Sequence, residues 1–208
     1  FIDYASWNGC FANGVSALAS LIGQQREIFL EPGFARSVAD RSNYIAGFFF
    51  AAARDEYDDH INPMRDSHRC MAQASLIGMK DFYRLGDAAL DAAEPPALRQ
   101  INDGVVAGYT GQAVAAQGAT AQCFFAMGFH LGSELLADRE FSLIDEHLRA
   151  HCNDLVQHLM RNTVTLAGAT HRCYAWVGVH SGHGGGVEAD HFDHAVQGAR
   201  EAFQYLAS

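Results

Sequence analysis

The sequence predicts an all-α fold, a single-domain helical bundle of six to eight helices. Apolar residues recur at the spacing of an amphipathic helix along most of the chain, and no run alternates apolar and polar residues as a half-buried strand would. Hydrophobic residues make up 49% of the 208 positions and charged residues 18%, a balance that favours one compact core. Without an internal repeat or a long linker, residues 1–208 are expected to form one domain.

Proline and glycine separate the helices expected in the first half of the chain. A first helix over residues 4–25 is followed by a second over residues 35–57. The second must end before Pro63, because proline cannot supply the backbone hydrogen bond of a helix interior. A third helix covers residues 65–85 and is followed by Gly86, a residue type common just beyond a helix C-terminus.

The second half of the chain carries weaker helix breaks. Pro95 and Pro96 open a fourth helix that reaches about residue 108, since proline is tolerated in a first turn. Several glycines then leave open whether residues 97–137 form one kinked helix or two. Three further helices are expected over residues 138–159, 163–180 and 187–206.

The charge balance excludes several classes of partner. Lys and Arg total 14 against 24 Asp and Glu, so the formal net charge is −10, which disfavours nucleic acid and anionic membranes. No apolar stretch approaches the roughly 18 residues of a membrane span, and residues 1–20 lack the basic start of a secretory signal. We therefore expect a cytoplasmic protein, and its thin polar surface is compatible with a homodimer.

The cysteines do not form a recognisable disulfide or zinc pattern. They are odd in number, widely spaced and never arranged as a CxxC pair, so reduced and mostly buried thiols are expected. The five are Cys10, Cys70, Cys123, Cys152 and Cys173.

The sharpest chemical feature is a Glu-x-x-His pair near the C-terminus. Glu188 and His191 stand three residues apart, hence on one helix face, where a carboxylate and an imidazole reach one metal ion. A third ligand would be His180 or His183. On a straight helix His180 lies roughly 16 Å from His191, so the intervening glycines must bend the chain, and the choice between the two histidines stays open.

Two further groups carry carboxylates and histidines. Glu56 closes one expected helix and His68 lies in the first turns of the next, so both can point inward from a corner; the alternative is a polar loop. Glu134 follows an almost wholly apolar stretch, where a buried carboxylate is costly unless it is paired or metal-bound. His130 lies one turn earlier on the same face, and the alternative for Glu134 is a helix end facing solvent.

Taken in order, these groups resemble the heme-oxygenase-like diiron oxidase and oxygenase family of iron-containing redox enzymes. That family carries an acidic corner followed by a histidine, a lone glutamate in a middle helix, and a late histidine with a carboxylate-x-x-His pair. The resemblance spans roughly residues 50–195. The matching positions here are Asp55-Glu56-Tyr57 then His68, Glu134 after Gly128-Phe129-His130-Leu131-Gly132-Ser133, and His180 or His183 with Glu188 and His191.

The resemblance implies an iron-dependent oxidoreductase that uses O2. Two Fe(II) ions per chain would be held by Glu56, His68, Glu134, Glu188, His191 and one of His180 or His183, with Glu134 as the bridging carboxylate; carboxylates and imidazoles suit Fe(II). The implied reactions are N-oxygenation, desaturation or oxidative C–C cleavage of a small amine, amino-acid-like or fatty-acid substrate. The phenylalanine runs at 48–50 and 124–125 would exclude water.

The sequence departs from the family pattern at two places. Asp58-Asp59-His60 stands where glycines usually follow the acidic corner, so a neighbour could replace Glu56 as ligand. Gly184 stands where the late histidine is expected, one turn before the carboxylate. The alternatives are a metal-free helical enzyme similar to thiaminase II, using Cys70 or Cys123, or to the quinone-cofactor oxidases, and a non-catalytic helical binding protein.

Overall fold

A computed structural model shows the predicted all-α class: eight α-helices and one two-stranded sheet lie in the part of the chain that it describes. It describes residues 1–56, 67–91, 93–166, 168–181 and 187–206, without the side chains of residues 54–56, 138 and 187–189. The helices are α1 (Ile2–Gly23), α2 (Ser42–Glu56), α3 (His68–Phe82), α4 (Pro96–Tyr109), α5 (Ala119–His151), α6 (Asn153–Arg161), α7 (Ala175–His180) and α8 (Val187–Gln204). The strands are β1 (Thr163–Leu166) and β2 (Ala169–Arg172).

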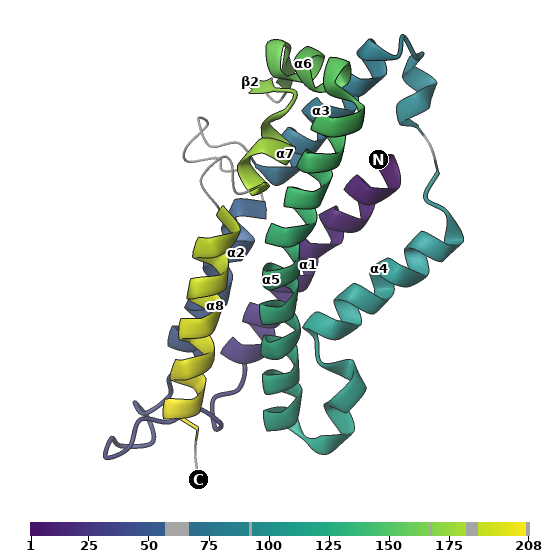
Figure 1. The fold of residues 1–208 in the computed structure, drawn as a ribbon. Coiled ribbons are helices and arrows are strands. Elements are labelled where there is room, and N and C mark those ends of the chain that lie inside the picture. The colour runs from purple at the N-terminus through teal and green to yellow at the C-terminus, as the bar shows by residue number, and fades with distance from the viewer. Residues whose placement is uncertain (57–66, 92, 167, 182–186, 207–208) are drawn as a thin grey trace.

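The 33-residue helix α5 runs the length of the molecule and organises the rest around it (Figure 1). Helices α2 and α8 lie on one side of it, α1 crosses behind it, and α4 lies on the other side (Figure 1). The β1–β2 hairpin gathers with α3, α6 and α7 around the C-terminal end of α5 (Figure 1). The main core lies among α1, α2, α4, α5 and α8, and its buried residues include Leu18, Ile45, Phe49, Tyr109, Met127 and Ala195.

Several expected boundaries are wrong. Helix α2 begins at Ser42, because residues 24–41 form turns and short β-bridges instead of the start of a helix. The stretch 97–137 contains two helices, α4 and the first part of α5, separated by a 3-10 turn whose flanking Gly111 and Gly118 both have positive φ. Helix α5 then continues through position 138, where a new helix was expected.

The helix expected over residues 163–180 is also wrong in its first half. Residues 163–166 and 169–172 pair as an antiparallel hairpin, with Val164 opposite His171. Gly168 in the turn has a φ of +84°, a conformation that favours glycine. Only the six residues of α7 remain helical, and they bring His180 into the interior.

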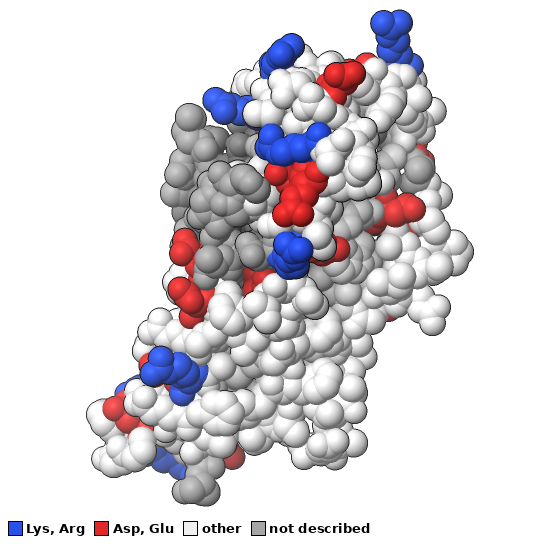
Figure 2. All heavy atoms as spheres, in the orientation of Figure 1, with Lys and Arg blue, Asp and Glu red and all other residues white. Residues whose placement is uncertain are grey.

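Charge is unevenly distributed on the face formed by α5 and α8. Figure 2 shows few charged side chains over the N-terminal half of α5, and more of both signs toward the two ends of the molecule. No helix in the described ranges combines the length and apolar character needed to cross a bilayer.

Two glycines of α1 offer a matched test of the core packing. A Cβ at Gly14 would lie 2.3 Å from the Tyr109 ring, whereas a Cβ at Gly9 would meet nothing within 4 Å. We expect Gly14→Ala to lower the free energy of unfolding by about 1–3 kcal/mol, as overpacking does. Gly9→Ala should raise it by roughly 0.5–1 kcal/mol through helix propensity. Urea unfolding of both variants measures the difference, and equal effects would contradict the tight α1–α4 contact.

Candidate metal centre

His68 and His180 meet in the interior although 112 positions separate them in the sequence. Their Nε2 atoms are 3.2 Å apart, and both side chains are buried. His68 is the first residue of α3, placed there by the N-cap Ser67, whose hydroxyl accepts a hydrogen bond from the Cys70 amide at 3.1 Å. His180 is the last residue of α7. The corner residue and the late histidine predicted from the sequence therefore lie side by side.

The tautomer of His180 follows from its backbone contact. Its Nδ1 lies 2.5 Å from the carbonyl oxygen of Trp176, and because that oxygen only accepts, Nδ1 carries the proton. The Nε2 of a neutral His180 therefore presents its lone pair to His68. The ring of Phe141 stacks on His180, with centroids 4.4 Å apart and planes at 22°, and so fixes the imidazole orientation.

Residues other than the two histidines hold α3 and α7 together. The Ser75 hydroxyl of α3 donates a hydrogen bond to the Cys173 carbonyl oxygen at 2.7 Å, just before α7. A Cβ at Gly78 would lie 2.6 Å from Leu159 and 2.8 Å from Cys173, so the absence of a side chain there permits the close approach. These contacts of α3 with the segment just before α7 help to position the two imidazoles.

Glu134 and His191 form a second pair beside the two histidines. The Glu134 carboxylate is buried, with Oε1 3.3 Å from Nδ1 of His130 and Oε2 3.6 Å from Nδ1 of His191. The ring centroids of His68 and His191 are 6.3 Å apart. Helices α3, α5, α7 and α8 therefore each contribute a buried donor to one small region. The alternative of a solvent-facing helix end does not hold for Glu134.

The remaining predicted ligands lie wholly or partly outside the described residues. Glu56 is the last residue of α2 and Glu188 lies in the first turn of α8, but neither side chain belongs to the described part. His183 lies outside it altogether. Because α7 ends at His180 and a separate α8 begins at Val187, the straight-helix distance between His180 and His191 does not apply.

The donor set fits a divalent ion in part. Two imidazole nitrogens bound at about 2.1 Å to one ion lie roughly 3.0–3.4 Å apart, depending on whether the angle between them is octahedral or tetrahedral. The 3.2 Å separation of His68 and His180 falls in this range. Among the described side chains, however, no three from His, Cys, Asp and Glu gather closely enough to hold a single ion. The described donors thus amount to two pairs, each of which needs a further ligand.

A largely apolar cavity of about 350 Å³ reaches this region. His68, His180 and Glu134 form part of its wall, and the rings of Trp7, Phe11 and Phe129 form another part. A second cavity of about 540 Å³, lined by polar and apolar residues that come mostly from α1 and α3, also reaches His68. His68 therefore lies where two cavities approach each other.

The cavity walls differ from those expected from the sequence. Phe49 packs in the core with its ring centroid 5.7 Å from that of His130, while Phe50 and Phe125 are exposed. The aromatic wall comes instead from Trp7 and Phe11, which no motif indicated. The two residues are four positions apart on α1 and their ring centroids are 5.0 Å apart, but nothing local in the sequence marks them as cavity residues.

Two of the cysteines, Cys123 and Cys10, lack the features of a nucleophile. Cys123 is fully buried in the main core, and burial raises the pKa of its thiol to about 11, so the thiolate is scarce at neutral pH. Cys10 lines the second cavity, and burial, followed by the charges of Glu94 and Asp103, raises its thiol pKa. These shifts disfavour cysteine catalysis by either residue.

In comparisons with known proteins, no family model, curated protein or solved structure matches this chain.

Proposed function

We propose that this chain is a non-haem iron-dependent oxidoreductase that uses O2 to oxidise a small organic substrate, with two Fe(II) ions per chain. The observation that carries the proposal is the meeting of His68, His180, Glu134 and His191 beside an apolar cavity, whose wall includes the first three. Glu56 and Glu188 would complete the ligand set, as the sequence resemblance implies. Nitrogen and oxygen donors of this kind suit Fe(II) and Mn(II).

The chain's own residues would divide the work as follows. His68 and His180 would hold one ion through Nε2, with the Trp176 carbonyl fixing the His180 tautomer. The buried Glu134 carboxylate would offset the positive charge of the ions, and His191 would bind beside it. When bound, the two ferrous ions would supply electrons for the reduction of O2. Trp7, Phe11 and Phe129 would keep water from the substrate.

Anaerobic titration of the metal-free protein with Fe(II) tests this proposal. Binding is expected to saturate at about two ions per chain, and the loaded protein should consume O2 on exposure to air while the metal-free protein does not. Saturation below one ion per chain, or O2 consumption equal to that of free Fe(II), would contradict it. A protein that uses the bundle only as a binding scaffold would show no metal-dependent O2 consumption.

A further inference from the structure

One end of the apolar cavity lies close to the protein surface. Trp7, Leu136 and Glu140 line this cavity and also line a broad surface groove of about 1090 Å³. His68, His180 and Glu134 line the cavity but not the groove. A ligand inside would therefore have one end toward the histidines and the other toward Trp7, Leu136 and Glu140.

The acidic and basic side chains that line this cavity are all acidic, apart from its histidines. Its charged lining residues in the described chain are Glu134 and Glu140, and neither lysine nor arginine contributes to the wall. Glu134 is engaged with His130 and His191. Glu140 is thus the carboxylate at the mouth that is separate from the histidine cluster.

Glu140 lies in surroundings that suit a bound cation. It is half-buried, and burial raises the pKa of its carboxyl. The rings of Tyr4 and Trp7 lie close together, with centroids 5.5 Å apart, and both line the surface groove with Glu140. A partly desolvated carboxylate beside aromatic faces attracts an ammonium group through charge and cation–π contacts.

We propose that Glu140 is a specificity-determining residue that binds the ammonium group of a small apolar amine, whose hydrocarbon part fills the cavity. The cavity lies near the lower end of the roughly 300–1,000 Å³ typical of small-molecule sites. Carboxylate ligands are disfavoured inside the cavity, where they would meet Glu134 and Glu140, whereas Arg139 lines only the outer groove. The role of this amine as a substrate rests on the proposed function, whereas its binding does not.

The distance between Glu140 and Glu134 indicates where the amine nitrogen would lie in the cavity. Glu134 and Glu140 are six residues apart on α5, roughly 9 Å along the helix axis at 1.5 Å per residue. An ammonium group held by Glu140 would lie well away from the Glu134 carboxylate. The nitrogen is therefore the anchor of the ligand, and the far end of the hydrocarbon chain faces the histidines.

Calorimetric titration of the metal-free protein with three probes of equal length tests the proposal. Hexylammonium is expected to bind at least 10-fold more tightly than hexanoate or 1-hexanol. Glu140→Gln should remove this preference, and Glu140→Lys should shift it toward hexanoate. Glu27→Gln, which changes an exposed carboxylate that lines neither the cavity nor the groove, is the matched control and should behave as wild type.

Several results would overturn the assignment. These are equal affinity for the three probes, no binding of any probe, or an undiminished preference for hexylammonium in Glu140→Gln. Thermal unfolding of each variant without ligand verifies that it is folded. Because these titrations contain no metal, a retained amine preference with failed Fe(II) binding would contradict the proposed function alone. Retained Fe(II) binding with no amine preference would contradict only the role of Glu140.

Discussion

Replacing Glu134 by glutamine is expected to lower the affinity for Fe(II) by at least about 100-fold and to abolish metal-dependent O2 consumption. The change keeps the size of the side chain and its capacity to contact His130 and His191, but it removes the buried negative charge. Loss of a group that merely supports a metal ligand typically costs 10–100-fold in affinity. Loss of a ligand carboxylate itself should cost at least as much.

Competition against a coloured Fe(II) chelator under anaerobic conditions measures the affinity. Glu146→Gln is the control, because it removes the same charge from an exposed position of α5. Thermal unfolding of the metal-free proteins separates a loss of ligand from a loss of fold. Wild-type Fe(II) affinity in a folded Glu134→Gln protein would contradict the placement of Glu134 in a metal centre.

The sequence predicted the fold class and four of the residues that converge. Glu134 was selected because it follows an apolar stretch, where a buried carboxylate requires a partner, and His191 because it stands three residues after Glu188. His68 was selected with Glu56 at a helix corner, and His180 as one of two candidates upstream of Glu188. Packing of an apolar helix face largely determines which side chains point inward, so helical periodicity carried this information. The positions of α3, α5, α7 and α8 relative to one another could not be read in the same way.

The boundaries of some helices and strands, and the residues of the cavity wall, were not predicted correctly, each for a different physical reason. The strands β1 and β2 have four residues each, too few for alternation to be distinguished from helical spacing. A new amphipathic helix was expected from residue 138, yet α5 continues without a break through that position, and only Arg139 beside it is exposed. Trp7 and Phe11 face the cavity only because α1 crosses behind α5, a tertiary arrangement without a local signal (Figure 1).

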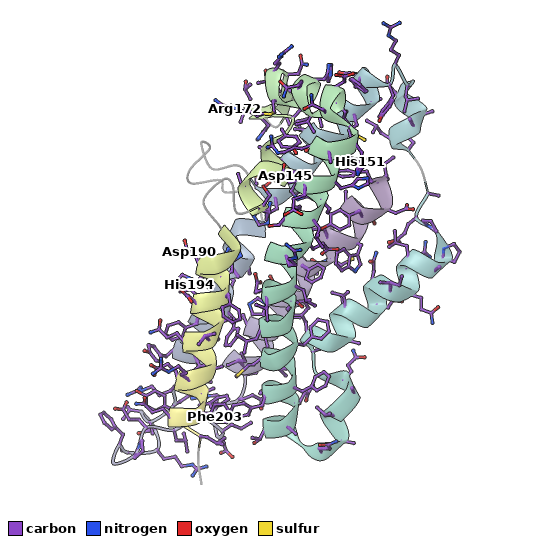
Figure 3. The ribbon with its side chains drawn as sticks, viewed as in Figure 1. Asp145, His151, Arg172, Asp190, His194 and Phe203 are labelled. Atoms are coloured by element: carbon purple, nitrogen blue, oxygen red, sulfur yellow. The ribbon has the colours of Figure 1, made fainter. Side chains whose placement is uncertain are left out.

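Away from the proposed metal centre, Asp145 anchors the segment that carries His180. It is fully buried on α5, toward the C-terminal end of the helix (Figure 3). One of its oxygens accepts a hydrogen bond from the Tyr174 hydroxyl, and both accept from Nε of Arg149, at 2.9 and 2.8 Å. Tyr174 directly precedes α7, so the carboxylate links α5 to the helix that ends in His180. Burial and then the bond to Asp145 raise the pKa of the Tyr174 hydroxyl, which keeps it protonated as the donor.

Asp145→Ala is therefore expected to lower the free energy of unfolding by about 3 kcal/mol, and Fe(II) affinity by about 10-fold through loosening of α7. The lower end of the roughly 3–5 kcal/mol range for a broken buried pair applies, because the Arg149 side chain is 42% exposed and can turn to water. Urea unfolding measures the loss, with Glu146→Ala on the same helix expected to stay within about 0.5 kcal/mol of wild type.

A double-variant experiment tests the contact itself. In a Tyr174→Phe background, Asp145→Ala should lower the free energy of unfolding by less, because the Tyr174 hydroxyl that this substitution would leave without a hydrogen bond is absent. Strict additivity of the two substitutions would show that the contact between Asp145 and Tyr174 contributes nothing to the link between α5 and α7.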